Sequence, residues 1–233
     1  MLTESRETDY HSAMSVYASG FCLGEGGRMR IEKKVLGACY TNVYLLISEQ
    51  NNALLIDPAD EAETIIQWIK DLSVTLKYII ITHGHADHVL ALEAVRDFFH
   101  VPVIISKTDA ERLTDTTLIN ERPYVKTSFR PVFPDLLIQE DDELWMDELK
   151  LRFYAMPGHT EGSAAIIVND VIFTGDTLLK GGHGKTSLPG GDTDRLIASI
   201  RRLLKDLPGN YRIMPGHREE TTLDVEREYW KTH

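Results

Sequence analysis

Residues 82–88 read Thr-His-Gly-His-Ala-Asp-His and hold three histidines and one aspartate. Three imidazoles and a carboxylate within six consecutive residues are hard to explain by packing. Neutral imidazole and carboxylate are the usual ligands of a borderline cation such as zinc, and Gly84 and Ala86 leave the loop room to bend around an ion. The loop therefore predicts a metal site, and a metal ion held there could activate water.

Three further polar residues follow glycine turns at the ends of other expected strands. They are His159 in Pro-Gly-His-Thr, Asp176 in Thr-Gly-Asp-Thr and His217 in Pro-Gly-His. A lone histidine or aspartate after glycine is usually a turn residue. All three, however, lie where a strand ends, and α/β proteins bind ligands at the carboxyl ends of their strands. We therefore expect them to meet the histidine loop at one sheet edge.

The combined set contains five histidines and two aspartates, which is seven protein ligands. That number is too large for one tetrahedral ion. Two ions with three terminal ligands each and one bridging carboxylate would use all seven, and a solvent hydroxide could complete the bridge. The members of the set are His83, His85, Asp87, His88, His159, Asp176 and His217.

Hydrophobic periodicity predicts the elements that position these residues. Short apolar runs predict strands over residues 43–47, 53–56, 78–81, 101–105, 149–155, 164–168, 171–174 and 211–214. Apolar residues at helical spacing predict helices over residues 61–72, 89–99, 108–121, 194–204 and 222–230. Irregular chain is expected around Pro123, Pro131 and Pro134. Two strand-rich blocks with interspersed helices indicate a layered α/β sandwich.

The first 28 residues differ from the rest of the chain. They are polar, lack periodicity and end in a glycine-rich stretch. We expect an N-terminal extension over residues 1–28 and a single domain over residues 29–233. Met29 is a candidate alternative start.

Composition and charge narrow the range of partners. The chain of 233 residues is 42% hydrophobic and 26% charged, as in ordinary globular proteins. Its 25 Lys and Arg against 36 Asp and Glu give a net charge of −11, which disfavours binding to nucleic acid or anionic membranes. The stretch 35–48 lacks charged residues and histidine but has only fourteen residues, fewer than the roughly 20 that span a bilayer.

The N-terminus also lacks the basic and then apolar order of a secretory signal. We therefore expect a cytoplasmic protein that acts on a small molecule. The sequence does not determine the oligomeric state, and a homodimer is compatible with it.

The four motifs together resemble those of the metallo-β-lactamase-fold hydrolases, and the similarity extends from about Arg30 to the C-terminus. The stretch 180–192, KGGHGKTSLPGGD, is most similar to the glyoxalase II-like branch, the hydroxyacylglutathione hydrolases. The resemblance implies an α/β (α+β) fold, a four-layer αββα sandwich with the site along the edge between its sheets. The ligands that it implies are His83, His85 and His159 for one ion and Asp87, His88 and His217 for the other, with Asp176 bridging.

The implied reaction is hydrolysis of a small thioester or ester by a hydroxide that bridges two divalent ions. Zinc is the expected metal, with iron or manganese as alternatives. One ion would polarise the carbonyl and stabilise the oxyanion. Asp87 and Asp176 are the expected catalytic residues, because as ligands they orient the nucleophile. A thiolate leaves readily, so the reaction needs no strong general acid.

Departures from the family pattern leave alternatives open. Full glyoxalase II enzymes carry a C-terminal helical domain that contributes to glutathione binding, whereas sixteen residues follow His217 here, so glutathione recognition stays open. Lactam-cleaving members usually lack the histidine found here as His88, which disfavours β-lactamase activity. Two histidines and one carboxylate would also suit a mononuclear non-haem iron enzyme such as a persulfide dioxygenase. A lactonase of the same fold is a further alternative.

Three more residues are candidates for supporting roles. Asp57, at a strand end, either accepts a hydrogen bond from a liganding histidine or is a turn residue before Pro58. Lys185, in the glycine-rich stretch, either contacts the substrate or is a solvated loop residue. His183 lies in the same stretch, where a surface position is favoured over a substrate contact.

Overall fold

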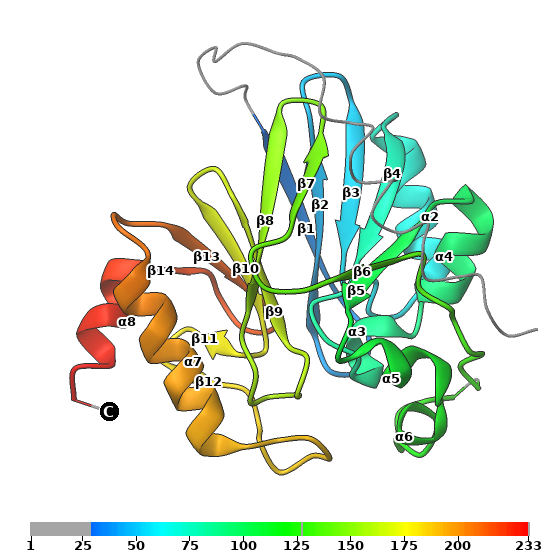
Figure 1. The fold of residues 1–233 in the computed structure, drawn as a ribbon. Coiled ribbons are helices and arrows are strands. Elements are labelled where there is room, and N and C mark those ends of the chain that lie inside the picture. Colours follow the sequence, from blue (N-terminus) through cyan, green and yellow to red (C-terminus); the bar gives the residue numbers. More distant parts are fainter. Residues whose placement is uncertain (1–28, 127, 233) are drawn as a thin grey trace, which may run out of the picture.

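Two six-stranded sheets lie against each other and share one apolar cluster (Figure 1). The computed structural model describes residues 29–126 and 128–232. The expected extension over residues 1–28 lies outside these ranges, and the division of the chain into extension and domain therefore stays a prediction.

The first sheet changes from antiparallel to parallel pairing at β3. Its strands, in spatial order, are β1 (Arg30–Leu36), β2 (Thr41–Ile47), β3 (Asn52–Ile56), β4 (Thr75–Ile80), β5 (Val103–Ser106) and β6 (Leu136–Ile138). Neighbours are antiparallel up to β3 and parallel from β3 to β6. Because parallel strands end at the same edge of a sheet, the C-terminal ends of β3, β4 and β5 lie side by side.

The second sheet also gathers three C-terminal strand ends at one edge. Its strands, in spatial order, are β14 (Thr221–Thr222), β13 (Arg212–Pro215), β10 (Val171–Gly175), β9 (Ala164–Val168), β8 (Leu149–Ala155) and β7 (Glu143–Met146). Strands β8 and β10 run in the same direction because both are antiparallel to β9, and β13 is parallel to β10. A small separate ribbon, β11 (Leu178–Leu179) and β12 (Gly182–His183), follows β10.

Helices cover the outer faces of both sheets (Figure 1). The first sheet packs against α2 (Ala62–Asp71) and α4 (Leu92–Phe99), and the second against α7 (Thr193–Asp206) and α8 (Leu223–Tyr229). The short helices α3 (Ala86–Val89), α5 (Ala110–Thr114) and α6 (Thr117–Asn120) lie beyond the C-terminal strand ends of the first sheet.

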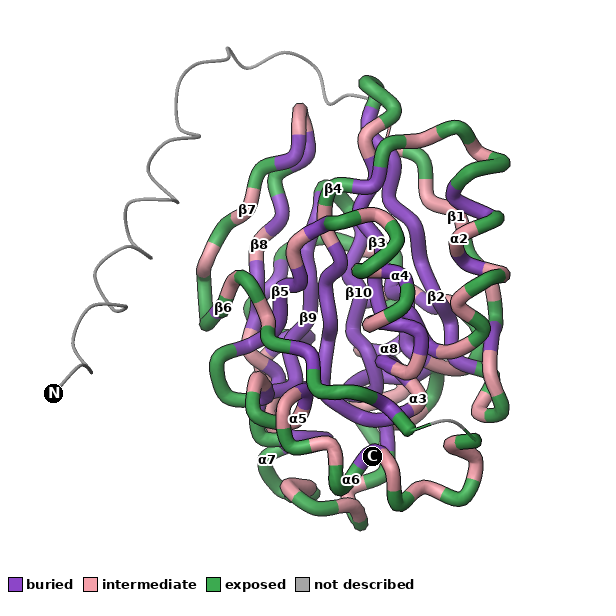
Figure 2. The backbone as a smooth tube through the Cα atoms, turned by 90° about the vertical axis from the view of Figure 1, so that its right-hand side faces the viewer, coloured by how far each residue is buried: buried purple, intermediate pink, exposed green. Residues whose placement is uncertain are grey.

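Three apolar clusters separate four layers. Successive residues of β3 point to opposite faces, so Leu55 packs towards the helices while Leu54 and Ile56 pack towards the second sheet. In β10, Phe173 joins the cluster between the sheets and Ile172 the cluster under α7 and α8. The central strands are therefore buried on both faces (Figure 2), which explains their continuous apolar runs. The predicted four-layer αββα sandwich is confirmed.

Two predicted helices differ from the structure. The helix expected over residues 89–99 begins at Leu92 as α4, and Val89 instead ends the separate α3, because the Ala91 amide donates to Pro58 O at 3.1 Å. The helix expected over residues 108–121 is broken at Asp115, which has an extended backbone and accepts a bond from the Thr117 amide. Strands β6 and β7 were not predicted, because three or four residues give too short a periodic signal.

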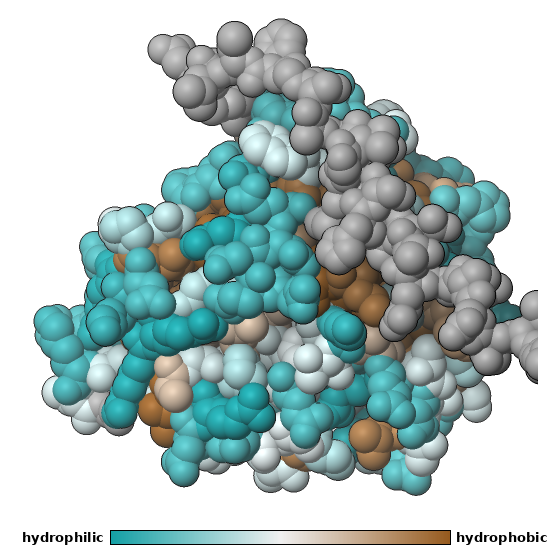
Figure 3. All heavy atoms as spheres, in the orientation of Figure 1, coloured by the Kyte–Doolittle hydropathy of each residue, from teal (hydrophilic) through white to brown (hydrophobic). Residues whose placement is uncertain are grey.

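The longest described helix, α7, has fourteen residues, fewer than the roughly 20 that cross a bilayer, and no helix within residues 29–126 and 128–232 is both long and apolar enough to do so. Hydrophilic residues predominate on the face seen in Figure 3. The expected cytoplasmic location stays a prediction.

Candidate metal centre

Four loops, one from the first sheet and three from the second, bring the seven predicted ligands together. Each loop begins where a strand ends, so the strand directions described above place the loops along one edge. The loop after β4 carries His83 and His85 and leads directly into α3, which carries Asp87 and His88, and the loops after β8, β10 and β13 carry His159, Asp176 and His217.

The first set of candidate ligands consists of His83, His85 and His159. His159 Nε2 lies 2.8 Å from His85 Nδ1 and 3.1 Å from His83 Nε2, so the three rings converge on one point. Burial lowers the pKa of His83 and His159, and burial together with His159 lowers the pKa of His85 to about 3. All three rings are therefore neutral at pH 7, which is the form that binds metal.

The second set consists of Asp87, His88 and His217. His217 Nε2 lies 3.1 Å from Asp87 Oδ2, and His88 Nε2 lies 3.9 Å from the same oxygen. Burial raises the pKa of Asp87, but His217 and His88 outweigh it and lower the value to about 2. Burial lowers the pKa of His217, but hydrogen bonds to Asp176 and Asp87 raise it to about 9. His217 thus carries a proton beside the ionised Asp87 carboxylate, and a bound cation would displace that proton.

The Asp176 carboxylate lies between the two sets. Its Oδ2 atom is 3.6 Å from His159 Nε2 in the first set and 3.4 Å from His217 Nε2 in the second. Its Oδ1 atom is 3.4 Å from His88 Nε2. Burial raises the pKa of Asp176, but His88 and His217 hold it well below the ordinary value. An ionised carboxylate in this position can serve both sets at once.

The unpartnered atoms of the centre fit a metal ion. His88 Nε2 and Asp176 Oδ1 face each other and are buried, and neither has a hydrogen-bond partner among the residues that the structure describes. A buried polar atom without a partner costs about 1–3 kcal/mol, so both atoms favour a bound ligand. Imidazole nitrogens and carboxylate oxygens are suited to zinc, iron or manganese.

Asp57 orients His88 of the second set through a hydrogen bond. Its Oδ2 atom accepts bonds from His88 Nδ1 at 2.8 Å and from Thr82 Oγ1 at 2.7 Å, and Oδ1 accepts the Thr82 amide at 2.8 Å. These bonds place the proton of His88 on Nδ1 and leave Nε2 directed at the centre. The contacts of Asp57 therefore fit orientation of a histidine better than a turn role before Pro58.

The other two supporting candidates do not join the ligand sets. The Lys185 side chain is exposed, but its main-chain carbonyl accepts a bond from His159 Nδ1 at 2.7 Å, which directs His159 Nε2 to the first set. His183 Nδ1 donates to Gly184 O at 2.7 Å, and its ring lies 6.1 Å from that of Trp230. Residue type could not reveal the role of position 185, because a carbonyl is common to all residues.

Asn42 and Tyr44 of β2 support the loop that carries His217. Asn42 Nδ2 donates to Pro215 O and Arg218 O, both at 2.9 Å, and the Tyr44 hydroxyl donates to Pro215 O at 2.7 Å. Sequence reasoning did not identify them. A signal was available, because a buried asparagine in an apolar strand needs hydrogen-bond partners.

Asn42→Ala should lower the free energy of unfolding of the metal-free protein by about 1–3 kcal/mol, because it leaves the buried carbonyl partners of Asn42 under-satisfied. Urea denaturation measures this change. Gln50→Ala, in the exposed turn between β2 and β3, is the matched control and should stay within about 0.5 kcal/mol of wild type. Equal stability of the two variants would show that Asn42 does not hold the loop.

Comparisons with known proteins agree with this architecture. The family model of the Metallo-beta-lactamase superfamily matches residues 36–217, a span that includes every candidate ligand. The hydroxyacylglutathione hydrolase GloC of Haemophilus influenzae is 34% identical over 202 residues, which are 85% of this chain and 95% of that protein. The crystal structure of BLEG-1, a B3 metallo-beta-lactamase, has a TM-score of 0.79 at 31% identity and covers 85% of this chain and 97% of its own. The structure of TTHA1623 in a di-iron-bound form has a TM-score of 0.77 at 30% identity and covers 85% and 98%.

Proposed function

This chain belongs to the metallo-beta-lactamase superfamily and has its fold, and from that premise we propose that it is a hydrolase that uses two divalent metal ions to cleave a small thioester or ester. The observation that carries the proposal is the position of the Asp176 carboxylate between two separate sets of candidate ligands. The similarity to a hydroxyacylglutathione hydrolase makes an acyl thioester of glutathione the first substrate class to test.

The chain provides a holder for each ion. His83, His85 and His159 would hold one, Asp87, His88 and His217 the other, and Asp176 would contact both. When bound, two divalent ions supply the positive charge that makes water nucleophilic near pH 7 and polarises a carbonyl.

Neighbouring groups keep the candidate ligands in the tautomers and ionisation states that bind a metal ion. Asp57 and the carbonyl of Lys185 fix the tautomers of His88 and His159. Asp87 and Asp176, whose pKa values are lowered, stay ionised and can orient the attacking water, but they do not donate protons. A thiolate leaves without a strong acid, so this set of groups is sufficient for a thioester. The exposed Lys185 ammonium is available to an anionic substrate.

Anaerobic assay of the zinc-loaded protein tests the proposal. We expect one thiol to be released for each acid formed from a hydroxyacylglutathione, and we expect a chelator to stop the reaction. A β-lactam and a lactone belong in the same screen, because one similar structure is that of a B3 metallo-beta-lactamase. If every ester and thioester is left intact while the iron-loaded protein consumes oxygen with a persulfide, the hydrolase proposal is wrong and the dioxygenase alternative is favoured.

A further inference from the structure

Asp109 is a fully buried carboxylate beside the candidate metal centre and is not one of its ligands. It follows β5, and Asp57 follows β3, so the two carboxylates flank the end of β4 and its histidine loop. We infer that Asp109 is a positioning residue that assembles the first ligand set, His83, His85 and His159, by joining loops from the two sheets. The inference rests on the proposed metal centre.

The contacts of Asp109 reach both loops that supply the first set. Its Oδ2 atom accepts the Gly84 amide at 2.9 Å and the Thr160 hydroxyl at 2.8 Å, and its Oδ1 atom accepts the Gly162 amide at 2.9 Å. Gly84 separates His83 from His85, and Thr160 follows His159. One side chain therefore binds residues next to all three histidines, two of which come from one sheet and the third from the other.

Arg112 extends this connection to a third loop. Its Nε donates to Asp109 Oδ1 at 3.2 Å, and its Nη2 donates to Pro189 O at 3.0 Å. Pro189 lies in the stretch whose Lys185 carbonyl orients His159. The Arg112 side chain is 14% exposed, so its charge compensates the buried carboxylate where water has little access.

The bonding pattern requires a carboxylate at position 109. Both carboxylate oxygens accept hydrogen bonds. Two of these bonds come from main-chain amides and one comes from the Arg112 guanidinium. An asparagine would direct its own N–H groups at one of these donors and leave a buried amide unpaired. Asp57 contacts His88 of the second set directly and reaches His83 only through the Thr82 hydroxyl, which lies 3.1 Å from His83 Nδ1. The Gly84, Thr160 and Gly162 partners of Asp109 lie beside the first set, so a change at Asp109 should affect the first set selectively.

Metal titration of the metal-free protein tests this selectivity. With cobalt(II), followed by visible absorption and calorimetry, His85→Ala identifies the binding step of the first set and His217→Ala that of the second. Asp109→Asn should weaken the step lost in His85→Ala by about 10–100-fold, the usual cost of removing a group that orients metal ligands, and leave the other step unchanged.

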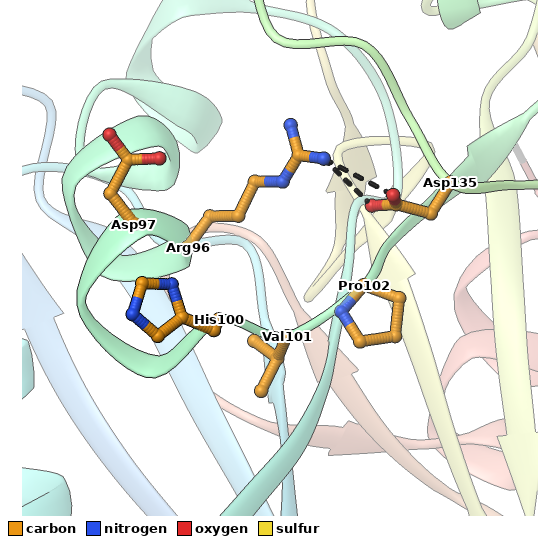
Figure 4. Close-up of a pocket in the computed structure, with 6 residues that line it drawn as sticks. All are labelled: Arg96, Asp97, His100, Val101, Pro102 and Asp135. Carbon is orange, nitrogen blue, oxygen red and sulfur yellow. Dashed lines mark hydrogen bonds and ion pairs between the residues drawn. The ribbon is translucent and has the colours of Figure 1, made fainter.

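Asp135→Asn is the matched control. Asp135 also accepts a main-chain amide, that of Val103 at 2.8 Å, and pairs with Arg96 at 3.1 Å (Figure 4). Val103 begins β5, whereas Asp109 follows its end. Asp135→Asn should change neither step. A first-set step that stays unchanged in Asp109→Asn, or two steps that weaken equally, would overturn the inference.

Thr160→Val provides a second test if Asp109→Asn does not fold, because it removes one of the bonds to Asp109, together with the 2.7 Å contact of the Thr160 hydroxyl with Ser163 Oγ. It should weaken the same step by a smaller factor, and an unchanged step would again overturn the inference. The titration distinguishes failure of this inference from failure of the proposed function. A wild-type protein without a first-set step contradicts the proposed centre, whereas a step that is present and indifferent to Asp109 contradicts only the positioning role.

Discussion

Asp176→Asn should lower kcat/KM for thioester hydrolysis by about 10³-fold, the scale on which enzymes lose activity when one group that stabilises the transition state is removed. The carboxylate faces His88 and His217 of the second set and His159 of the first. The asparagine amide would replace one of its oxygens with an N–H group that cannot bind a metal ion. Steady-state kinetics with metal analysis of the same preparation measures the effect.

Asp170→Asn is the control for this substitution. Asp170 precedes β10 and is exposed, whereas Asp176 follows the same strand and is buried. The control should retain wild-type activity and metal content. If Asp176→Asn does so as well, the carboxylate is not shared by the two sets.

Gly216→Ala is expected to have the second largest effect. A Cβ atom at this position would lie 2.4 Å from Asp176 Oδ1 and 2.7 Å from His88 Cε1. The backbone cannot move away freely, because the Gly216 N–H donates to Gly175 O and the Gly216 carbonyl accepts the main-chain N–H of Asn42, both at 2.7 Å. The two side chains must therefore shift. Misplacement of reacting groups by about 1 Å costs on the order of 10²-fold in rate, and we expect that loss together with the loss of one bound ion per chain.

Gly209→Ala separates this contact from general destabilisation. Gly209 has a φ of +85°, so alanine is strained there, but its Cβ would meet no atom within 4 Å in the described part of the chain. This control should be less stable and keep its metal. Full metal content in Gly216→Ala would contradict the placement of His88 and Asp176.

Several strands could be predicted from the sequence more accurately than the helices between them. Strands at 149–155 and 164–168 have the predicted bounds, because continuous apolar runs are typical of strands buried on both faces. The late start of the helix expected over residues 89–99, at Leu92, could not be predicted, since the bond from the Ala91 amide to Pro58 O joins segments that only the folded chain brings together.

In the candidate site, the ligands could be predicted from the sequence, but the residues that orient them could not. Its seven predicted ligands stand in short motifs with recognisable spacing, and the structure brings them to one edge. Asp109 and Asn42 stand in no such motif, and their partners lie in loops far away in the sequence. The sequence indicates which groups could bind a metal, whereas the groups that orient them are identified by the contacts of the fold.

The metal content of the wild-type protein tests the central claim most directly. Protein purified without added metal, then dialysed against zinc and against metal-free buffer, is analysed by mass spectrometry against protein concentration. We expect two divalent ions per chain, because the chain offers two sets of ligands joined by one carboxylate. A single ion per chain at saturation, above all iron in a protein that consumes oxygen with a persulfide, would contradict this expectation.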